Sequence, residues 1–283
     1  MIKFVFWDVQ HGHATYLQTP TKHIVFDLGT GSYGSEKEFS PLRHLKNKWG
    51  VKQLDGVIIT HPHTDHLDDI FAFAELSPKV IRRPKHLTDK DIYQANRNED
   101  KEVVSKYLEI SSLYSSAVGS GENPFSAENN GGVTIKSFTP QSCSTSNLNN
   151  HSVVTVVSYE SCKLLIPGDN EPSSWDELLG DESFITEIKG TDVLLAPHHG
   201  RKSGFSSSLF EHISPCLTVI SDGRFCDTSA TGRYSEKTKG WNVHKRSGKD
   251  EERKCVTTRN DGVIVVKLGR NDNGNRFIDV TID

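Results

Sequence analysis

The segment Thr60-His61-Pro62-His63-Thr64-Asp65-His66 places three imidazoles and one carboxylate within six consecutive residues. It directly follows the apolar run at 57–59, which is typical of a buried strand. Imidazole and carboxylate groups are the usual ligands of zinc and similar first-row cations. In an extended segment His61 and His63 can point to one side, while Asp65 and His66 can reach a second ion as the chain turns. The segment therefore predicts a metal site where a core strand ends.

Working outward from this segment, the length and composition describe one large domain. A chain of 283 residues can bury a sizeable core, and a single domain over 1–283 with an insertion at 85–130 accounts for it. No apolar run approaches the roughly 18 to 20 residues that span a bilayer, so we expect no membrane association. The net charge of -4 argues against a strongly cationic nucleic-acid binder but leaves room for a local basic rim.

The cysteines and the N-terminus bear on the compartment. The five cysteines are odd in number and widely spaced, which favours free thiols in a reducing compartment; they are Cys143, Cys162, Cys216, Cys226 and Cys255. The first residues are too short an apolar run, and too soon acidic, for a secretory signal. We therefore expect a cytoplasmic protein.

Hydrophobic patterning predicts a mixed α/β chain. Strands are expected at 2–7, 14–17, 23–26, 57–59, 133–135, 153–158, 163–166, 192–196, 217–220, 263–268 and 277–282. A helix is expected at 40–49, with Ser40 as its N-cap before Pro41, and a short one at 68–76. The polar insertion predicts one long helix over 89–114, which either caps the rim of the site or decorates the surface. Residues 222–250 are expected to form a long loop.

The spacing His-x-His-x-Asp-His at 61–66 resembles the signature of the metallo-β-lactamase superfamily residue for residue. This resemblance implies a four-layer αβ/βα sandwich that carries one or two divalent metal ions at one edge. The ions would be zinc, with manganese as the alternative. The remaining ligands would come from later strand ends, where this chain again carries histidines and carboxylates.

The same resemblance implies which of these later groups bind metal. Asp169, after an apolar strand and a glycine, matches the aspartate that bridges the two ions. The third ligand of the first ion would be His151, with the amide oxygen of Asn149 as a competitor. The last ligand of the second ion would be His198 or His199, and we favour His198 because it is closer to the strand end. The implied metal ligands are thus His61, His63, Asp65, His66, His151, Asp169 and His198.

Two aspartates are expected to orient these ligands rather than to bind metal. Asp27 lies in an Asp-x-Gly turn after a strand, where the superfamily has an aspartate that partners a ligand. Asp8 lies in the first loop and is given the same supporting role.

Four segments resemble the ComEC-type competence proteins and their stand-alone relatives. Residues 8–14 are similar to their Asp-Val-Gly-Gln-Gly-Asp loop, and residues 149–154 to their Asn-Asn-x-Ser-Leu-Val segment. Residues 197–203 are similar to their Pro-His-His-Gly-Ser-Lys segment, and residues 257–264 to their closing strand. Gln10 and His13 depart from the pattern, since glycine and aspartate are usual there. The resemblance covers the hydrolase module and does not extend to a membrane channel.

In that branch the module is associated with phosphodiester cleavage of DNA, so the resemblance implies a phosphodiesterase or nuclease that uses a water activated by two metals. Asp65, His198 and His199 are the expected catalytic residues. The expected phosphate-binding residues are His11, His13, Arg201 and Lys202. Two alternatives stay open: hydrolysis of a small phosphodiester or other ester, and a non-catalytic metal-binding module. A basic groove beside the metals would favour a polymer, and a pocket covered by the insertion would favour a small substrate. The oligomeric state stays open.

Overall fold

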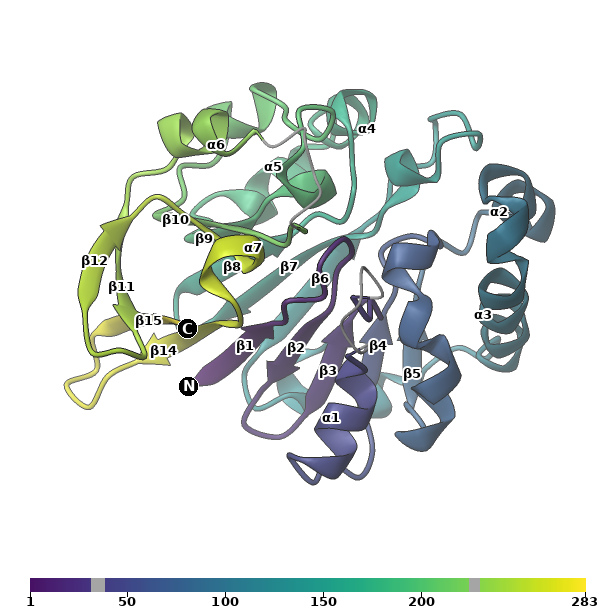
Figure 1. Cartoon of the computed structure of the whole chain (residues 1–283), viewed down its shortest axis with the longest axis horizontal. Coiled ribbons are helices and arrows are strands. Elements are labelled where there is room, and N and C mark those ends of the chain that lie inside the picture. The colour runs from purple at the N-terminus through teal and green to yellow at the C-terminus, as the bar shows by residue number, and fades with distance from the viewer. Residues whose placement is uncertain (32–38, 224–229) are drawn as a thin grey trace.

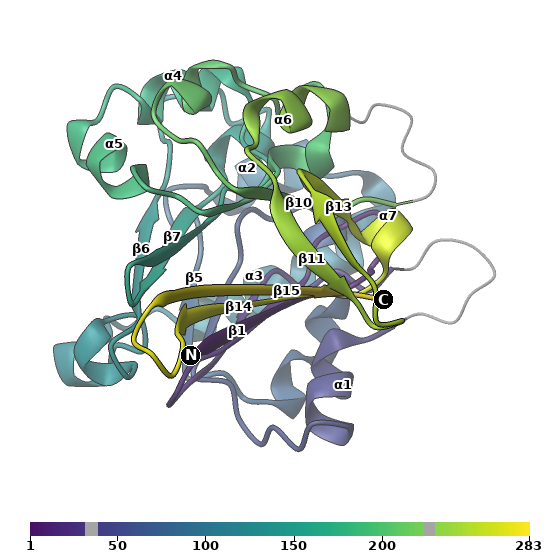
Figure 2. The same cartoon turned by 90° about the vertical axis from the view of Figure 1, so that its left-hand side faces the viewer.

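The computed structural model of the chain describes residues 1–31, 39–223 and 230–283. Two mixed β-sheets face each other, and helices cover the outer face of each sheet (Figure 1; Figure 2). This arrangement confirms the four-layer αβ/βα sandwich expected from the sequence.

The first sheet has nine strands and contains both ends of the described chain. Its order is β12 (Asp250–Arg253), β11 (Trp241–Lys245), β15 (Arg276–Ile282), β14 (Ile264–Arg270), β1 (Ile2–Phe6), β2 (Thr15–Gln18), β3 (His23–Phe26), β4 (Gly56–Ile58) and β5 (Val80–Arg82). The strands β3, β4 and β5 run parallel, with Phe26 beside Ile58 and Ile58 beside Arg82. The loops after these three strands therefore emerge at one edge of the sheet.

The second sheet has six strands. Its order is β13 (Cys255–Thr257), β10 (Leu217–Ile220), β9 (Val193–Leu195), β8 (Cys162–Ile166), β7 (Val154–Tyr159) and β6 (Thr134–Phe138). The strands β8, β9, β10 and β13 are parallel, so the loops that follow them also share one edge. The metal-binding segments predicted from the sequence follow β4, β8 and β9.

The α-helices form the two outer layers. Those over the nine-stranded sheet are α1 (Pro41–Asn47), α2 (Asp89–Ala95) and α3 (Lys101–Leu113), and those over the six-stranded sheet are α4 (Pro172–Leu178), α5 (Glu182–Ile188) and α6 (Thr231–Lys237). A short helix, α7 (Thr258–Asp261), leads from β13 to β14. The 3-10 helices are η1 (Thr64–His66), η2 (Asp68–Glu75), η3 (Asn98–Asp100), η4 (Ser120–Glu122), η5 (Ala127–Asn129), η6 (Leu148–His151), η7 (Pro197–Gly200) and η8 (Ser208–Glu211).

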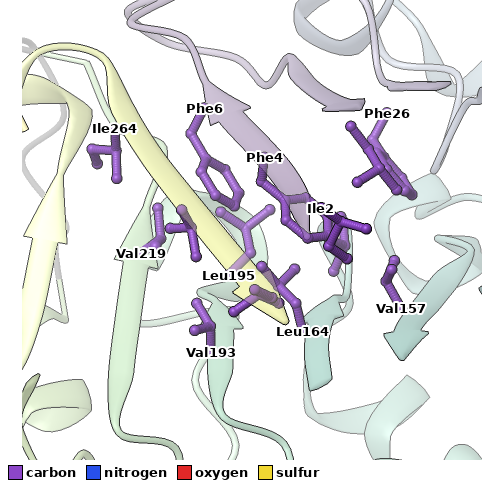
Figure 3. Close-up of a cluster of buried hydrophobic side chains, with 14 of the residues drawn as sticks. Ile2, Phe4, Phe6, Phe26, Val157, Leu164, Val193, Leu195, Val219 and Ile264 are labelled. Carbon is purple, nitrogen blue, oxygen red and sulfur yellow. The ribbon is translucent and has the colours of Figure 1, made fainter. Parts of the chain in front are cut away.

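The main core lies between the sheets and follows from the alternation of side chains along each strand. Ile2, Phe4 and Phe6 of β1 point into it, toward Leu164 and Leu195 of the facing sheet (Figure 3). Burying each of these side chains contributes roughly 1.5–3 kcal/mol. The intervening residue Val5 faces the opposite way, into the apolar layer under α1 and α3.

The helix at 40–49 begins as predicted but the predicted long helix at 89–114 is wrong. The Ser40 hydroxyl accepts a hydrogen bond from the Arg43 N–H at the start of α1. In the insertion, α2 ends at Ala95, the backbone of Asn96 is extended, and α3 begins only at Lys101. The Asn96 side-chain amide donates to the carbonyl oxygens of Pro62 and Ile92, at 2.9 Å each. These tertiary and local bonds stabilise an elbow that helical periodicity does not reveal.

The predicted loop at 222–250 is also wrong for its described part, which contains α6 and β11. In β11, Trp-Asn-Val-His-Lys, only Val243 is fully buried, so the alternation is too weak to identify a strand from the sequence. Residues 224–229 lie outside the described residues. Strand β5 and helices α4 and α5 were not predicted either.

The cysteines that the structure describes carry free thiols, as expected: Cys143, Cys162, Cys216 and Cys255. Cys226 lies outside the described residues. Among the helices of the described segments, none has both the length and the apolar character needed to cross a bilayer.

Candidate metal centre

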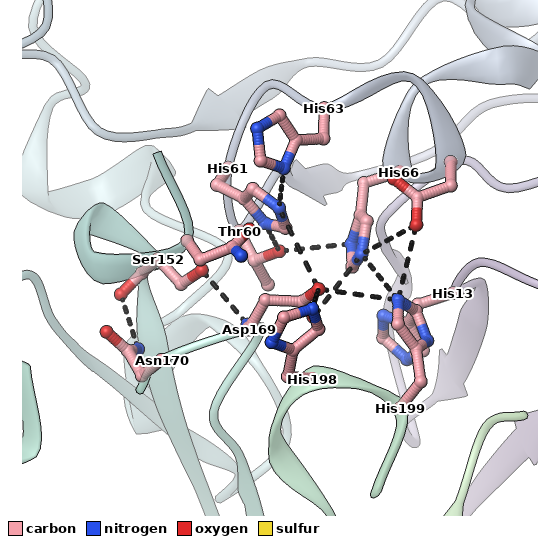
Figure 4. A network of polar contacts seen from close by, with 12 residues as sticks. His13, Thr60, His61, His63, His66, Ser152, Asp169, Asn170, His198 and His199 are labelled. Carbon is pink, nitrogen blue, oxygen red and sulfur yellow. Dashed lines mark hydrogen bonds and ion pairs between the residues drawn. The ribbon is translucent and has the colours of Figure 1, made fainter. Parts of the chain in front are cut away.

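Strand β4 delivers the histidine-rich segment to the edge where the two sheets meet. After Ile58 the chain leaves the sheet and turns through η1, which orients the side chains of this segment toward one point (Figure 4). His61 and His66 are almost fully buried, whereas His63 and Asp65 are partly exposed. The site therefore has a buried floor and an open side.

The floor of the site is a group of imidazole and carboxylate atoms from three loops. His61 Nε2 lies 2.9 Å from His63 Nδ1 and 4.0 Å from an oxygen of Asp169. His66 Nε2 lies 3.4 Å from the other Asp169 oxygen and 3.3 Å from His199 Nε2. These nitrogens and oxygens converge as ligands around cations would, and the structure brings together the segments after β4, β8 and β9 as the sequence predicted.

Asp27 lies behind this floor and holds it by hydrogen bonds. Its carboxylate is fully buried and accepts from the backbone and hydroxyl of Thr60, at 2.7 and 2.8 Å. It also accepts from Nδ1 of His66 and of His13, at 2.8 and 2.9 Å. Because Nδ1 of His66 donates to a carboxylate, Nε2 is fixed toward the cluster, which is how carboxylates usually orient metal-binding histidines.

Asp169 reaches the centre of the cluster because of the glycine before it. Gly168 has φ +60°, and a Cβ there would lie 2.7 Å from the Cβ of Ser152 and 2.8 Å from that of Thr60. The Asp169 N–H donates to the Ser152 hydroxyl at 3.0 Å. The tight turn after β8 thus directs the carboxylate between the two groups of histidines.

The two histidines of η7 differ in position, and the geometry favours His199 over His198 as a metal ligand. His199 is buried, its Nδ1 donates to the Ser221 carbonyl, and its Nε2 lies 3.3 Å from Asp65 and 3.4 Å from Asp169. His198 is more exposed, and its Nε2 is 3.8 Å from Asp169. Both residues have a left-handed backbone, with φ of 49° and 53°, and this turn sends one ring inward and the other toward the cavity.

Asn149 and His151 are also separated by the structure. His151 is fully buried, but its Nδ1 lies 2.9 Å from His86 Nε2. None of its contacts in the described chain reaches the His–Asp cluster. Among the described residues, the side-chain oxygen of Asn149 and Nε2 of His151 are both buried without a hydrogen-bond partner, but only Asn149 lines the same cavity as His63 and Asp169. An unpaired buried acceptor is costly, and a cation would satisfy it. The geometry therefore favours Asn149 as the additional ligand.

The charges of the cluster fit divalent cations. Burial raises the pKa of Asp169, but His199, His66 and His198 lower it well below its usual range. Burial lowers the pKa of His66, but Asp169, Asp27 and Asp65 raise it well above its usual range. Burial lowers the pKa of His61 well below its usual range, so that ring is neutral and able to bind metal. Nitrogen and oxygen donors of these kinds suit zinc.

Metal affinity should rise with pH because of His199. Burial lowers the pKa of this imidazole, but Asp169 and Asp65 raise it to about 10. His199 is therefore protonated at neutral pH, and a cation bound at Nε2 must displace the proton. We expect the apparent zinc affinity to increase about tenfold per pH unit between pH 6 and 8 for each proton displaced. Competition titration with a chromogenic chelator at several pH values, corrected for the chelator's own protonation, measures this dependence. A pH-independent affinity would contradict it.

A cavity of about 560 Å³ opens onto the cluster. His63, Asp65, Asp169 and His198 form its metal side, and Asn149 lies beside them. The opposite rim comes from residues 95–100, the elbow between α2 and α3. The insertion therefore caps the rim of the site, which was one of the two roles expected for it.

The predicted phosphate-binding residues do not all reach this cavity. Arg201 lines it, and its guanidinium lies 3.4 Å from His198 Nε2 and 3.0 Å from His11 Nε2. Lys202 is exposed and does not line it. His13 is buried, with one ring nitrogen on Asp27 and the other 2.7 Å from the Thr15 hydroxyl. Since both nitrogens are engaged away from the cavity, His13 supports the floor and does not contact substrate.

The first loop supplies one further group to the cluster. His11 Nε2 lies 3.4 Å from Asp65, and its ring packs 4.9 Å from that of His199. His11, Asp65 and His199 together could hold a cation. Asp8 accepts hydrogen bonds from the backbone and side chain of Gln10. Asp8 thus supports the turn that carries His11.

Two site residues were missed in the sequence. Glu171 lies 3.3 Å from His198 Nδ1 and accepts from the side chain of Asn147. Asn96 ties the elbow to the loop that carries His61 and His63. The position of Glu171, two residues after Asp169, is the only signal of its role that the sequence offers.

Residues 7–211 match the profile of the metallo-β-lactamase superfamily. With this match, the fold and the His–Asp cluster, the chain belongs to that superfamily.

The relatives that it matches include competence proteins, as the sequence resemblance indicated. The chain is 24% identical over 220 residues to Recombination protein 2 of Haemophilus influenzae, covering 77% of this chain and 24% of that protein. It is 23% identical over 245 residues to ComE operon protein 3 of Bacillus subtilis, covering 77% of this chain and 28% of that protein. The chain thus spans about a quarter of the length of these relatives. Among solved structures, the metallo-β-lactamase fold protein YhfI of Bacillus subtilis is 14% identical, with a TM-score of 0.43 over 80% of this chain and 88% of that one.

Proposed function

We propose that the protein is a phosphodiesterase that cleaves DNA at a dinuclear metal centre. The observation that carries this proposal is the convergence of six imidazole and carboxylate side chains beside a cavity that also contains an arginine. These are His61, His63, Asp65, His66, Asp169 and His199, with Arg201 on the rim. Relatives in the competence group support a nucleic-acid substrate.

Different residues of the site would hold each of the two cations. His61, His63 and Asn149 would hold one cation, Asp65, His66 and His199 the other, and Asp169 would lie between them. Two divalent cations bound there supply positive charge for a phosphate and lower the pKa of a water molecule toward neutrality. Asp65 is partly exposed to the cavity, so its carboxylate can also orient that water.

The chain also provides groups for the substrate. Arg201 directs its guanidinium into the cavity, where it can donate to phosphate oxygens. His198 lies beside it, held by Glu171 and by the Ser203 hydroxyl at 3.0 Å from Nδ1. With Nδ1 on Glu171, Nε2 of His198 lies 3.4 Å from the Arg201 guanidinium, so His198 can position Arg201 for a phosphate oxygen.

Hydrolysis of a small phosphodiester is the second candidate, and the elbow at 95–100 is the observation that favours it. The elbow walls one side of the cavity, whose volume of about 560 Å³ is within the usual range for small-molecule sites. Zinc- or manganese-loaded protein should be tested on single- and double-stranded DNA, on RNA and on bis(p-nitrophenyl) phosphate. Cleavage of the aryl ester without any cleavage of nucleic acid would support the second candidate, and no cleavage of any of them would refute both.

Arg201 and Lys202 should differ sharply although they are adjacent. We expect Arg201→Ala to raise KM for a DNA substrate about tenfold or more, because a charge-assisted hydrogen bond of roughly 1.5–3 kcal/mol is lost. Lys202→Ala is the matched control and should change KM less than twofold, since its side chain does not line the cavity. Steady-state kinetics on one oligonucleotide measures both. Equal effects of the two substitutions would show that Arg201 contributes only general surface charge.

A further inference from the structure

A second cavity, of about 510 Å³, lies beside the edge strand β5 and is distinct from the metal cavity. Its cationic lining comes from Arg82, Arg83 and Lys85, and His86 lies beside them. Among the described residues that line it, none is acidic. A cavity with three permanent positive charges and no carboxylate is complementary to a phosphate-bearing ligand.

The two arginines are held in place by the fold. The Arg82 guanidinium donates to the Ser137 hydroxyl at 2.8 Å and lies 4.1 Å from the centre of the Phe125 ring. Arg83 donates through Nη2 to the Ser111 carbonyl of α3, on the opposite side of β5 from the Arg82 side chain.

The sheet register places this cavity next to the metal centre. Arg82 pairs with Ile58 in the parallel ladder of β4 and β5, and its carbonyl accepts from the Ile59 N–H at 2.9 Å. The segment 83–86 therefore leaves the sheet at the same edge as the segment that begins at His61. The two loops belong to neighbouring strands.

A histidine pair joins the walls of the two cavities. His86 lines the cationic cavity, and its Nε2 lies 2.9 Å from Nδ1 of His151. His151 ends η6, the same short helix that carries Asn149 into the metal cavity. The segment that carries Asn149 into the metal cavity is therefore in direct contact with a residue that lines the cationic cavity.

We propose that the cavity lined by Arg82, Arg83 and Lys85 binds the phosphate backbone of the nucleic-acid substrate on one side of the scissile bond. This inference rests on the proposed phosphodiesterase function and supports the polymer among its two candidate substrates. The metal cavity alone fits a small ester, whereas a second phosphate-binding cavity at the same sheet edge would add contacts to a chain of phosphates.

Lys85 offers the cleanest test, because it is exposed and its side chain has no recorded bond in the described structure. The variants are Lys85→Gln, Arg83→Gln and the double substitution, and Lys52→Gln is the matched control. Lys52 is equally exposed but precedes β4, at the opposite end of that strand. Thermal unfolding of each variant verifies that it folds, and Lys85→Gln remains informative if loss of the Arg83–Ser111 bond destabilises the others.

The substrates are a 20-nucleotide single-stranded DNA and bis(p-nitrophenyl) phosphate. We expect Lys85→Gln to raise KM for the DNA about tenfold and to lower the slope of log(kcat/KM) against log[salt] by about 0.7, as loss of one phosphate contact requires. The double variant should lower the slope by about twice as much. Hydrolysis of the aryl ester should be unchanged in every variant, and Lys52→Gln should match the wild type on both substrates.

Three results would overturn the inference, and they are distinguishable. Wild-type KM and salt slope for the DNA in Lys85→Gln would show that the backbone does not use this cavity, while the phosphodiesterase function stands. Lys85→Gln could also keep wild-type DNA kinetics but lose the binding of a deoxynucleoside monophosphate, as measured by calorimetry. This result would show that the cavity is a pocket for free nucleotides instead. If the wild-type protein cleaves neither substrate, the proposed function itself falls.

Discussion

Replacing Asp65 with alanine is expected to lower the turnover of phosphodiesters roughly a thousandfold while leaving the fold intact. Asp65 lies within 3.4 Å of both His11 and His199, so its loss removes a carboxylate from one half of the cluster. Its side chain is 21% exposed, and His199 keeps Asp169 as a partner. The fold therefore loses little when the carboxylate is removed. Turnover at saturating substrate and metal content per protein are the measurements.

Asp68→Ala is the control for Asp65→Ala. Asp68 lines the same cavity, but among the described residues it is not part of any group of side chains arranged to hold a metal ion. It should change turnover by no more than a few fold, which separates loss of a ligand from loss of any negative charge in the cavity. Wild-type turnover in Asp65→Ala would place the chemistry elsewhere.

Asp27→Ala is expected to have the largest effect on stability. Asp27 is fully buried and accepts four hydrogen bonds, two from Thr60 and one each from His13 and His66. Without it, these buried donors lose their partner, at a cost of about 3–5 kcal/mol. For a chain of this size such a cost lowers Tm by on the order of 10 °C. Metal affinity should fall about 10- to 100-fold, since His66 is no longer oriented.

Differential scanning calorimetry and metal titration test these two effects together. Asp55→Ala is a useful comparison, because Asp55 is also buried and accepts from the His23 N–H, but at the start of β4, away from the cluster. That variant should lose stability and keep metal affinity. An Asp27→Ala protein with wild-type Tm and wild-type metal affinity would contradict the supporting role of this carboxylate.

The pH dependence of stability follows from the same carboxylate. Burial raises the pKa of Asp27, but His66 and His13 lower it well below its usual range. A carboxylate whose folded-state pKa is depressed stabilises the protein above its unfolded pKa of about 3.9, and this stabilisation is lost as the pH falls below that value. The acid sensitivity of the centre therefore lies below about pH 4.

The sequence predicted those parts of the fold and the site that depend on local patterns. Strand β3 was located with its bounds, and α1 was found from Ser40 and Pro41, because a cap and a fixed proline φ act on the nearest residues. The elbow at Asn96 was missed for the opposite reason. It is stabilised partly by a hydrogen bond from Asn96 to the carbonyl oxygen of Pro62, 34 residues away in the chain. The hydrophobic residues on either side of the elbow keep a helical spacing, so the sequence pattern does not reveal the break.

By itself, the sequence determined the family, the four-layer sandwich and the loops that carry the candidate metal-binding side chains. Spacing within 61–66 and the apolar strands before each loop contain that information. Only the tertiary structure favours His199 over His198, and Asn149 over His151, as candidate metal ligands. The reason is that neighbouring residues in a turn point in different directions. Which of them faces the cluster depends on contacts such as His199 to Ser221 and His151 to His86, between segments that the sequence does not bring together.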